Sequence, residues 1–373
     1  MLTPLQVGNF KFKNRLVMPG MTRCRSDPLT GVPNDLVKEY YIQRAESAAL
    51  IISESMPVNG YCNPWPGSAA VWNEDALPAW KGIIDAIHKK NSYIFAQLSH
   101  GGRLVHPDLA GGRKPLSSSA IKLSGEAHVP SGKKPYETPE AMTNSQIQEV
   151  INDFSKCFQN AKKAGFDGIE INGGSGLLID QFIQSGINHR FDEYGGSVKG
   201  RCRFALEIVD EALKYWDAKQ IGIKISIVGR SFDSYDENPQ ETLAYLLPEL
   251  DRRGILYINM VEAEDYIPEN NGSLKISNVA KEARKHWKRT IITNGFTSLE
   301  ERSRKIADGE ADLVAFARVF IANPDLALRL KNSWPLAEPD QGTFFFGGEK
   351  GFTDYPKYID PKKSQAKCGC TIF

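Results

Sequence analysis

The sequence predicts an α/β fold, a (β/α)8 TIM barrel with a long insertion after the third strand. Two observations predict it. Short apolar or β-branched runs recur along the chain, and a stretch with helical periodicity follows each run. Eight such runs follow one another in an unbroken series, which favours a closed barrel over an open, doubly wound sheet. The length of 373 residues suits one barrel with insertions.

The expected strands and helices alternate in chain order. The strands are 15–19, 49–54, 93–98, 168–172, 221–226, 256–261, 290–294 and 312–317. Amphipathic stretches that predict helices are 146–164, 201–216, 239–252, 278–286 and 299–307. In the first of these, the apolar residues from Ile147 to Ala161 recur on one face, as in a helix that covers a sheet.

The longest departure from this alternation is the segment 103–142, which is rich in Gly, Pro, Ser and Lys. Insertions of this length are usually functional. We expect this one to form a lid above the carboxyl ends of the strands, where barrels of this kind build their active sites. The predicted FMN-binding barrel domain spans 1–356, and 357–373 is expected to be a flexible tail.

Composition and charge exclude several classes of function. Lys and Arg number 46 against 45 Asp and Glu, so the chain lacks the positive excess typical of nucleic-acid binders, and a small-molecule substrate is expected. The first ten residues do not form a secretory signal, and no apolar run is long enough to cross a membrane. We therefore expect a cytoplasmic monomer or homodimer. The six cysteines lack zinc spacing, so no metal site and only reduced thiols are expected.

The last two strands end in residues suited to a phosphate. Gly295 follows Asn294, and its missing side chain lets backbone amides approach an anion. Arg318 follows Ala317 and presents a fork of donors to oxygen atoms. Barrels of this class often place a phosphate at these two strand ends. The alternative is a tight turn beside a surface arginine.

Three polar residues at other strand ends extend this interpretation. Lys224 ends an apolar run and shares a face with Ser226 inside the predicted barrel mouth, so it needs an anionic partner. That partner is either a cofactor ring or a carboxylate, Glu170 or Glu262. Gln97 can donate and accept, as an imide edge requires, and Thr22 adds a hydroxyl. Together with the predicted phosphate site, these residues outline FMN.

At this point the sequence resembles the Old Yellow Enzyme family of FMN-dependent NAD(P)H oxidoreductases, from about Leu2 to Pro356. The stretches that carry the resemblance are 14–23, 97–103, 165–170, 180–182, 190–197, 311–318 and 321–325. The resemblance implies two half-reactions, in which NAD(P)H reduces FMN and the reduced flavin reduces an activated alkene. The cofactor carries the redox chemistry, while the protein orients and polarises the substrate.

The resemblance implies roles for the individual residues that match the family's motifs. Thr22 would contact the flavin ring near its reactive nitrogen, Gln97 the pyrimidine edge, and Arg318 the phosphate. The further cofactor-binding candidates are Pro19, Met21, Ser55, Lys224, Asn294, Gly295, Ala317 and an aromatic residue, Phe345 or Phe346. Thr22, Asn172 and Ser175 are the catalytic candidates.

Four positions with expected roles depart from the family pattern. Where the family usually has His-Gly-Ala-Asn-Gly-Tyr, this chain has residues 172–177, Asn-Gly-Gly-Ser-Gly-Leu. Asn172 and Ser175 can still donate hydrogen bonds to a substrate carbonyl, but Leu177 cannot deliver the proton that the usual tyrosine supplies. Lys224 replaces an arginine and keeps its charge without its forked geometry. Reduction of simple enones is therefore expected to be weak.

Two other functions remain open. Lys224 could form a Schiff base with a carbonyl substrate, as in a lyase or aldolase, if burial lowers its pKa. A flavin protein that has lost reduction, or that catalyses a redox-neutral isomerisation, is the second alternative. Separately, the ending Cys370-Thr371-Ile372-Phe373 is typical of a prenylation box, which predicts a lipid anchor at Cys370 and membrane association. The alternative is a disordered tail that ends this way by chance.

Overall fold

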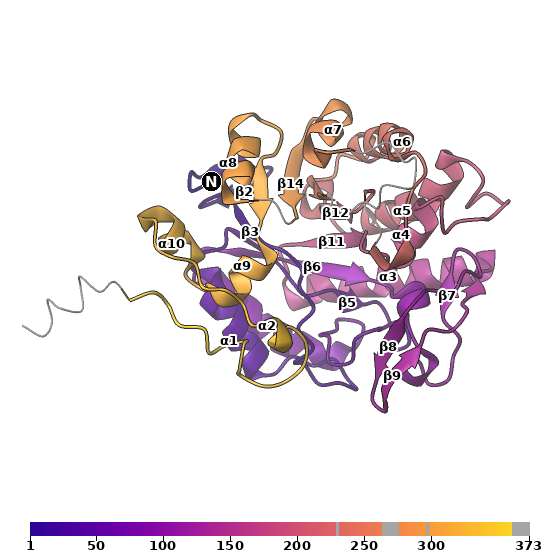
Figure 1. Ribbon diagram of the computed structural model, residues 1–373, viewed down its shortest axis with the longest axis horizontal. Helices are drawn as coiled ribbons and strands as arrows, with labels where there is room; N and C mark the ends of the chain where they lie inside the picture. Colours follow the sequence, from indigo (N-terminus) through magenta and orange to yellow (C-terminus); the bar gives the residue numbers. More distant parts are fainter. Residues whose placement is uncertain (229–230, 263–275, 296–297, 360–373) are drawn as a thin grey trace, which may run out of the picture.

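Eight parallel strands close into a barrel, which confirms the predicted fold (Figure 1). The computed structural model describes residues 1–228, 231–262, 276–295 and 298–359. The barrel strands are β3 (Leu16–Met18), β4 (Leu50–Ile52), β6 (Tyr93–Ser99), β11 (Gly168–Gly173), β12 (Ile221–Ile225), β13 (Tyr257–Val261), β14 (Thr290–Asn294) and β15 (Leu313–Ala315). The ring is complete because β15 pairs with β3, while β6 pairs with both β4 and β11. A short strand, β5 (Met56–Pro57), adds to the end of β6.

The amino-terminal end of the barrel is closed by a hairpin, β1 (Leu5–Val7) with β2 (Phe10–Phe12). Phe10 stacks edge-on against Phe95 inside the barrel, with ring centroids 5.4 Å apart. The interior continues upward through apolar side chains of the strands, including Tyr257 and Ile292. Because apolar side chains fill this end, a ligand can enter the barrel only at the carboxyl ends of the strands.

Helices form the outer layer around the barrel (Figure 1). They are α1 (Asp35–Ala45), α2 (Leu77–His88), α3 (Asn144–Ala164), α4 (Leu178–Ile183), α5 (Val198–Ala212), α6 (Pro239–Arg252), α7 (Val279–His286), α8 (Leu299–Ala307), α9 (Ala317–Ala322) and α10 (Leu326–Asn332). Short 3-10 turns lie at Glu74–Ala76, Gly102–Leu104, Pro107–Leu109, Ala218–Gln220, Ser231–Asp233 and Gln341–Thr343. The bounds predicted for α6 and α8 are confirmed. Helix α3 begins earlier than predicted, since Thr143 and Gln146 form a capping box.

The insertion 103–142 has strands of its own. The strand β7 (Leu116–Ser117) pairs with β10 (Glu140–Ala141), and β8 (Glu126–Val129) forms a hairpin with β9 (Gly132–Pro135). Arg103 at its start is buried and donates to the carbonyls of Ile121 and Phe232, at 3.2 and 2.7 Å. These contacts hold the insertion against the loop that follows β12.

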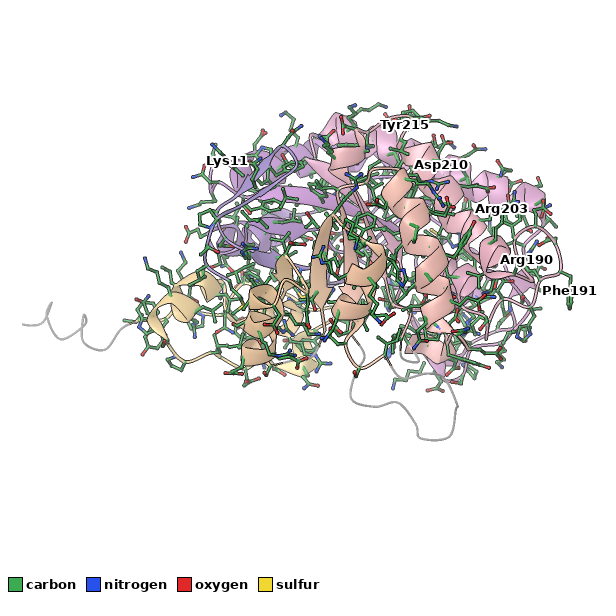
Figure 2. All side chains as sticks on the ribbon, turned by 90° about the horizontal axis from the view of Figure 1, so that it is seen from above. Lys11, Arg190, Phe191, Arg203, Asp210 and Tyr215 are labelled. Atoms are coloured by element: carbon green, nitrogen blue, oxygen red, sulfur yellow. The ribbon has the colours of Figure 1, made fainter. Side chains whose placement is uncertain are left out.

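The far end of the insertion is held by the segment 190–197. Arg190 donates to the carbonyls of Ser118 and Met142, at 3.1 and 2.6 Å, and its guanidinium forms an ion pair with Asp192. The next side chain, Phe191, is fully exposed and projects from the margin of the molecule (Figure 2). This segment therefore fixes the insertion and does not reach the barrel mouth.

The carboxyl-terminal segment folds back over the first barrel loop. Arg23 donates to the carbonyls of Phe344 and Gly351, both at 2.8 Å, and Phe352 stacks on Tyr40 at 4.0 Å. This contact brings Phe344 to the barrel mouth. Only residues 357–359 of the predicted tail, and not Cys370, lie within the described residues. No helix among the described residues is long and apolar enough to cross a membrane.

Candidate active site

A cavity of about 380 Å³ opens at the carboxyl ends of the barrel strands. Ten of the predicted site residues line it: Met21, Thr22, Ser55, Gln97, Asn172, Ser175, Lys224, Ala317, Arg318 and Phe345. They come from six different strand ends and from the carboxyl-terminal segment. The cavity thus unites residues that lie more than 300 positions apart in the sequence.

A buried network of amides holds Gln97 in one orientation. Its Nε2 donates to Oε1 of Glu170 at 2.6 Å, and its Oε1 accepts from Nδ2 of Asn172 at 3.1 Å. The carboxylate of Glu170 also accepts from Tyr257 and Asn259, both at 3.0 Å. Each polar atom of the Gln97 amide can therefore form one more hydrogen bond, Nε2 as a donor and Oε1 as an acceptor.

Gly20 leaves room above this amide. A Cβ atom at this position would lie 2.6 Å from both polar atoms of Gln97, so no side chain fits here. Because Gly20 has no side chain, a flat ligand in the cavity can reach Gln97. This arrangement fits a cofactor whose planar ring has an imide edge.

Lys224 and Arg318 bring positive charge to the same cavity. Burial lowers the pKa of Lys224, while the nearby charges of Glu170 and Asp180 oppose that shift. No carboxylate among the described residues lies within ion-pair distance of Lys224. Two cationic side chains in one cavity fit an anionic, phosphorylated ligand.

The alternative that Lys224 pairs with Glu262 was wrong. Oε1 of Glu262 lies 2.7 Å from Nζ of Lys305, and the carboxylate also accepts the backbone N–H groups of Val279 and Ala280 at the start of α7. A carboxylate at a helix amino terminus satisfies groups that the helix leaves free. Glu262 therefore holds α7 and α8 to the barrel.

Four predicted residues lie outside the lining of the cavity. Pro19 follows β3, and Asn294 ends β14. Gly295 packs so closely on Glu262 that a Cβ atom would lie 2.8 Å from the Cβ of that residue. Phe346 has a left-handed backbone, with φ of 62°, and its N–H donates to the carbonyl of Arg23, so Phe344 lines the cavity beside Phe345.

Sequence reasoning missed several cavity residues, among them Trp65 and Phe232. Their rings lie 6.5 Å apart, and Phe232 has a left-handed backbone with φ of 52°. Both residues lie in irregular loops, where no periodicity marks the direction of a side chain. Leu177 also lines the cavity and packs on Leu104 and Leu123 of the insertion.

The two predicted substrate-facing donors differ in their surroundings. Nδ2 of Asn172 donates to Ser55 at 3.3 Å as well as to Gln97, and its Oδ1 accepts from Gly174. Ser175 has a left-handed backbone, with φ of 60°, and its N–H donates to Oγ of Ser226 at 2.6 Å. The Ser175 hydroxyl has no hydrogen-bond partner among the described residues, so it is the donor that remains free.

Residues 1–337 match the family described as NADH:flavin oxidoreductase / NADH oxidase. This chain belongs to that family, the Old Yellow Enzymes. It is 36% identical to 12-oxophytodienoate reductase 1 of rice, Oryza sativa, over 95% of this chain and 92% of the relative. It is 33% identical to a probable flavin mononucleotide-dependent alkene reductase of Leishmania infantum, over 95% of this chain and 97% of the relative.

Solved structures give the same assignment. The Old Yellow Enzyme homologue from Zymomonas mobilis is similar with a TM-score of 0.90 and 33% identity, covering 96% of this chain and 99% of that one. The expected cofactor and reductant are confirmed, because Old Yellow Enzymes are FMN-dependent and take hydride from a nicotinamide. The chain is thus an NAD(P)H:flavin oxidoreductase of the ene-reductase type.

Proposed function

We propose that this Old Yellow Enzyme reduces an alkene conjugated to a carbonyl group, and that Ser175 is the main donor to the carbonyl oxygen. The observation that carries the proposal is the free Ser175 hydroxyl in a cavity that also holds Gln97, Lys224 and Arg318. When bound, FMN supplies the hydride transfer of both half-reactions. The protein binds and orients the reactants.

The cofactor would be held at its edge and at its phosphate. Gln97 would offer one donor and one acceptor to the pyrimidine edge, and the ammonium of Lys224 would stabilise negative charge on the ring. Arg318 would bind the phosphate, with backbone groups of Gly295 and Ala317 beside it. Thr22 would donate its hydroxyl near the reactive nitrogen.

Substrate activation then depends mainly on the Ser175 side chain. A hydrogen bond to the carbonyl oxygen stabilises the enolate that forms when the neighbouring alkene accepts hydride. Asn172 can provide such a bond only by leaving Gln97 or Ser55, since both of its N–H groups are engaged. Ser175 needs no such exchange. We therefore assign the larger contribution to Ser175 and a supporting one to Asn172.

Protonation of the α-carbon is the step for which no tyrosine lines the cavity among the described residues. Leu177 carries no proton to give, and it is buried against the insertion. Water that enters the cavity is then the proton source. Losing a positioned acid typically costs a factor of about one hundred or more, so turnover of simple enones should be slow.

Separate half-reactions test the assignment of Ser175. We expect Ser175→Ala to slow reoxidation of the reduced enzyme by 2-cyclohexenone by about one hundredfold, because one oxyanion donor is lost. Anaerobic reduction by NADPH should be unchanged in the same variant. Ser145→Ala, at a position outside the cavity, is the control. Equal reoxidation rates in Ser175→Ala and the unmodified enzyme would rule out the role of Ser175.

One observation favours a second candidate function. The described lining of the cavity lacks the usual tyrosine, which suits a redox-neutral isomerisation, in which a substrate is rearranged without net consumption of nicotinamide. Product analysis with a catalytic amount of NADPH distinguishes the two: reduction stops when the nicotinamide is used, whereas isomerisation continues.

The Schiff-base alternative depends on Lys224, whose pKa is lowered by burial. A free amine at this position could condense with a carbonyl substrate. Borohydride treatment in the presence of a carbonyl substrate tests this function, because it would attach the substrate to Lys224. Absence of such an adduct in the flavin-loaded enzyme would exclude it.

A further inference from the structure

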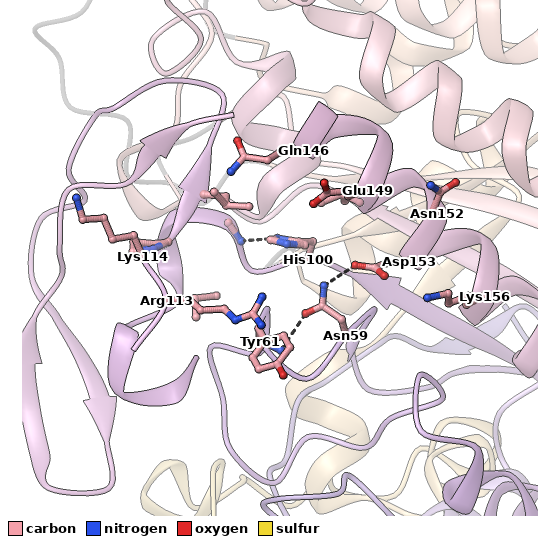
Figure 3. Close-up of a pocket in the computed structure, with 15 residues that line it drawn as sticks. Asn59, Tyr61, His100, Arg113, Lys114, Gln146, Glu149, Asn152, Asp153 and Lys156 are labelled. Carbon is pink, nitrogen blue, oxygen red and sulfur yellow. Dashed lines mark hydrogen bonds between the residues drawn. The ribbon is translucent and has the colours of Figure 1, made fainter. Parts of the chain in front are cut away.

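A second cavity, of about 440 Å³, lies on the flank of the barrel between the insertion and α3 (Figure 3). We call it the flank cavity. Its walls are Asn59, Tyr61, His100, Gly102, Val105, residues 113–116, Gln146, Glu149, Val150, Asn152, Asp153 and Lys156. It shares no lining residue with the cavity at the barrel mouth. None of the chemistry proposed above uses it.

His100 provides a hydrogen-bond donor in the wall of this cavity. Its Nδ1 accepts from the N–H of Gly102 at 3.0 Å, so the proton of the neutral ring lies on Nε2. The side chain is 94% buried, and burial lowers its pKa to about 3, which keeps the ring neutral at ordinary pH. Nε2 has no hydrogen-bond partner among the described residues. His100 lines the cavity and its Nε2 is not among the fully buried polar atoms, so an acceptor that binds in the cavity can reach it.

Two cationic side chains in the walls also lack an anionic partner. The guanidinium of Arg113 lies on the ring of Tyr61, 3.8 Å from its centroid, and makes no ion pair among the described residues. Lys156 on α3 likewise makes no ion pair there, whereas Lys114 lies 3.6 Å from Glu140. Because Arg113 is stacked on an aromatic ring, its donors are held in place without being used. These groups suit a carboxylate.

Acceptors complete the opposite wall (Figure 3). Glu149 and Asp153 lie one turn apart on α3, and Asp153 already accepts from Nδ2 of Asn59 at 2.7 Å. Glu149 has no partner among the described residues. The carboxylates would repel a simple anion. An anion that also carries a hydroxyl or ammonium group could bind the cationic wall and donate hydrogen bonds to the carboxylates.

We propose that the flank cavity is a binding site for a small hydroxycarboxylate or aminocarboxylate, separate from the site of alkene reduction. The carboxylate of the ligand binds Arg113 and the Nε2–H of His100. Its hydroxyl or ammonium group donates to Glu149 and Asp153. Such a ligand bridges the insertion and α3, and it is neither substrate nor reductant.

Calorimetric titration of the full-length, FMN-loaded protein tests the proposal with four probes: L-lactate, L-serine, acetate and inorganic phosphate. We expect L-lactate or L-serine to bind at one site per chain and more tightly than acetate, which lacks the second group. Arg113→Gln should weaken that binding by about tenfold, as expected for loss of a charged hydrogen bond. Lys122→Gln, an exposed lysine of the insertion outside the cavity, is the matched control and should have no effect.

A second variant should change the affinity for acetate in the opposite direction. Glu149→Gln removes a repulsive charge and should strengthen binding of acetate, while reducing the preference for L-serine over acetate. Failure of all four probes to bind, or binding that Arg113→Gln leaves unchanged, would overturn the proposal. So would a tenfold rise in the KM for NADPH in Arg113→Gln, because the cavity would then belong to the reductant's site. None of these results depends on which alkene the enzyme reduces.

Discussion

Leu177 is the residue at which this chain differs most in chemistry from what its family pattern implies. It lines the barrel-mouth cavity, and it also packs on Leu104 and Leu123 of the insertion, so one side chain forms part of the cavity wall and contacts the insertion. The sequence predicts that Leu177 replaces a proton donor, and this remains a prediction. Its contact with the insertion could not be predicted, because both leucines lie in an irregular segment.

Leu177→Tyr should restore a proton donor. We expect reoxidation by 2-cyclohexenone to accelerate by about one hundredfold, since a positioned acid contributes that much to proton transfer. Leu177→Phe is the matched control, with the same ring and no hydroxyl. Stopped-flow absorbance of the flavin measures both rates. An equal rate in the tyrosine and phenylalanine variants would show that protonation does not limit this half-reaction.

Substitutions of Lys224 test how the cavity stabilises negative charge. We expect Lys224→Met to weaken FMN binding by at least tenfold, because the positive charge is lost, and Lys224→Arg to retain binding. Fluorescence quenching of FMN titrated with the apoprotein gives both affinities. If the methionine variant binds FMN as tightly as the unmodified chain, the ammonium does not face the cofactor.

Asp180 makes stability depend on pH. It is buried beneath the cavity, accepting from Gly176 and Gln184, and burial raises its pKa from 3.8 to about 7. The folded state therefore holds a proton that the unfolded state releases. The resulting contribution of Asp180 to the free energy of unfolding is fully present below pH 3.8 and is lost as pH rises towards 7.

Asp180→Asn should remove that pH dependence. The free energy of unfolding of the unmodified protein, relative to the variant, should fall between pH 5 and pH 8 by on the order of 3 kcal/mol. Guanidinium unfolding of the apoprotein at both pH values measures the difference, and other buried carboxyl groups cancel because both chains contain them. A relative stability that does not change with pH would refute the assignment.

At the scale of elements, periodicity predicted the barrel strands and several helices within a few residues. Helix α6 followed from its pattern because Asn238 caps it and its apolar residues recur regularly. Helix α5 was predicted to end at Trp216, but it ends at Ala212. Trp216 is buried and donates to the carbonyl of Phe158, so tertiary contact, not helical periodicity, explains its apolar character.

The strands of the insertion were not predicted, because each is only two to four residues long. Arg103 now provides a test of its attachment. Arg103→Met should leave the carbonyls of Ile121 and Phe232 without partners, and should loosen the insertion by about 1–3 kcal/mol. Limited proteolysis should then cut within 103–142 faster than in Arg113→Met, whose guanidinium makes no such bonds. Equal cleavage would show that Arg103 does not hold the insertion.

At the scale of the whole molecule, the fold was predictable because a closed barrel repeats one unit eight times, and each unit has its own local signal. The cavity depends on contacts that have no local signal. Phe344 reaches it only because Arg23 and Arg25 bind carbonyls of the carboxyl-terminal segment, more than 300 positions away. Trp65 and Phe232 likewise required the assembled fold.

We propose that the barrel mouth binds FMN between Gln97, Lys224 and Arg318 and uses it for reduction. Spectroscopic titration of the purified chain with FMN, followed by anaerobic NADPH and then an enone, tests it most directly. We predict one yellow FMN per chain, bleaching by NADPH and a return of the yellow colour with the enone. A protein that stays colourless with added FMN, or a bound flavin that NADPH does not bleach, would contradict it.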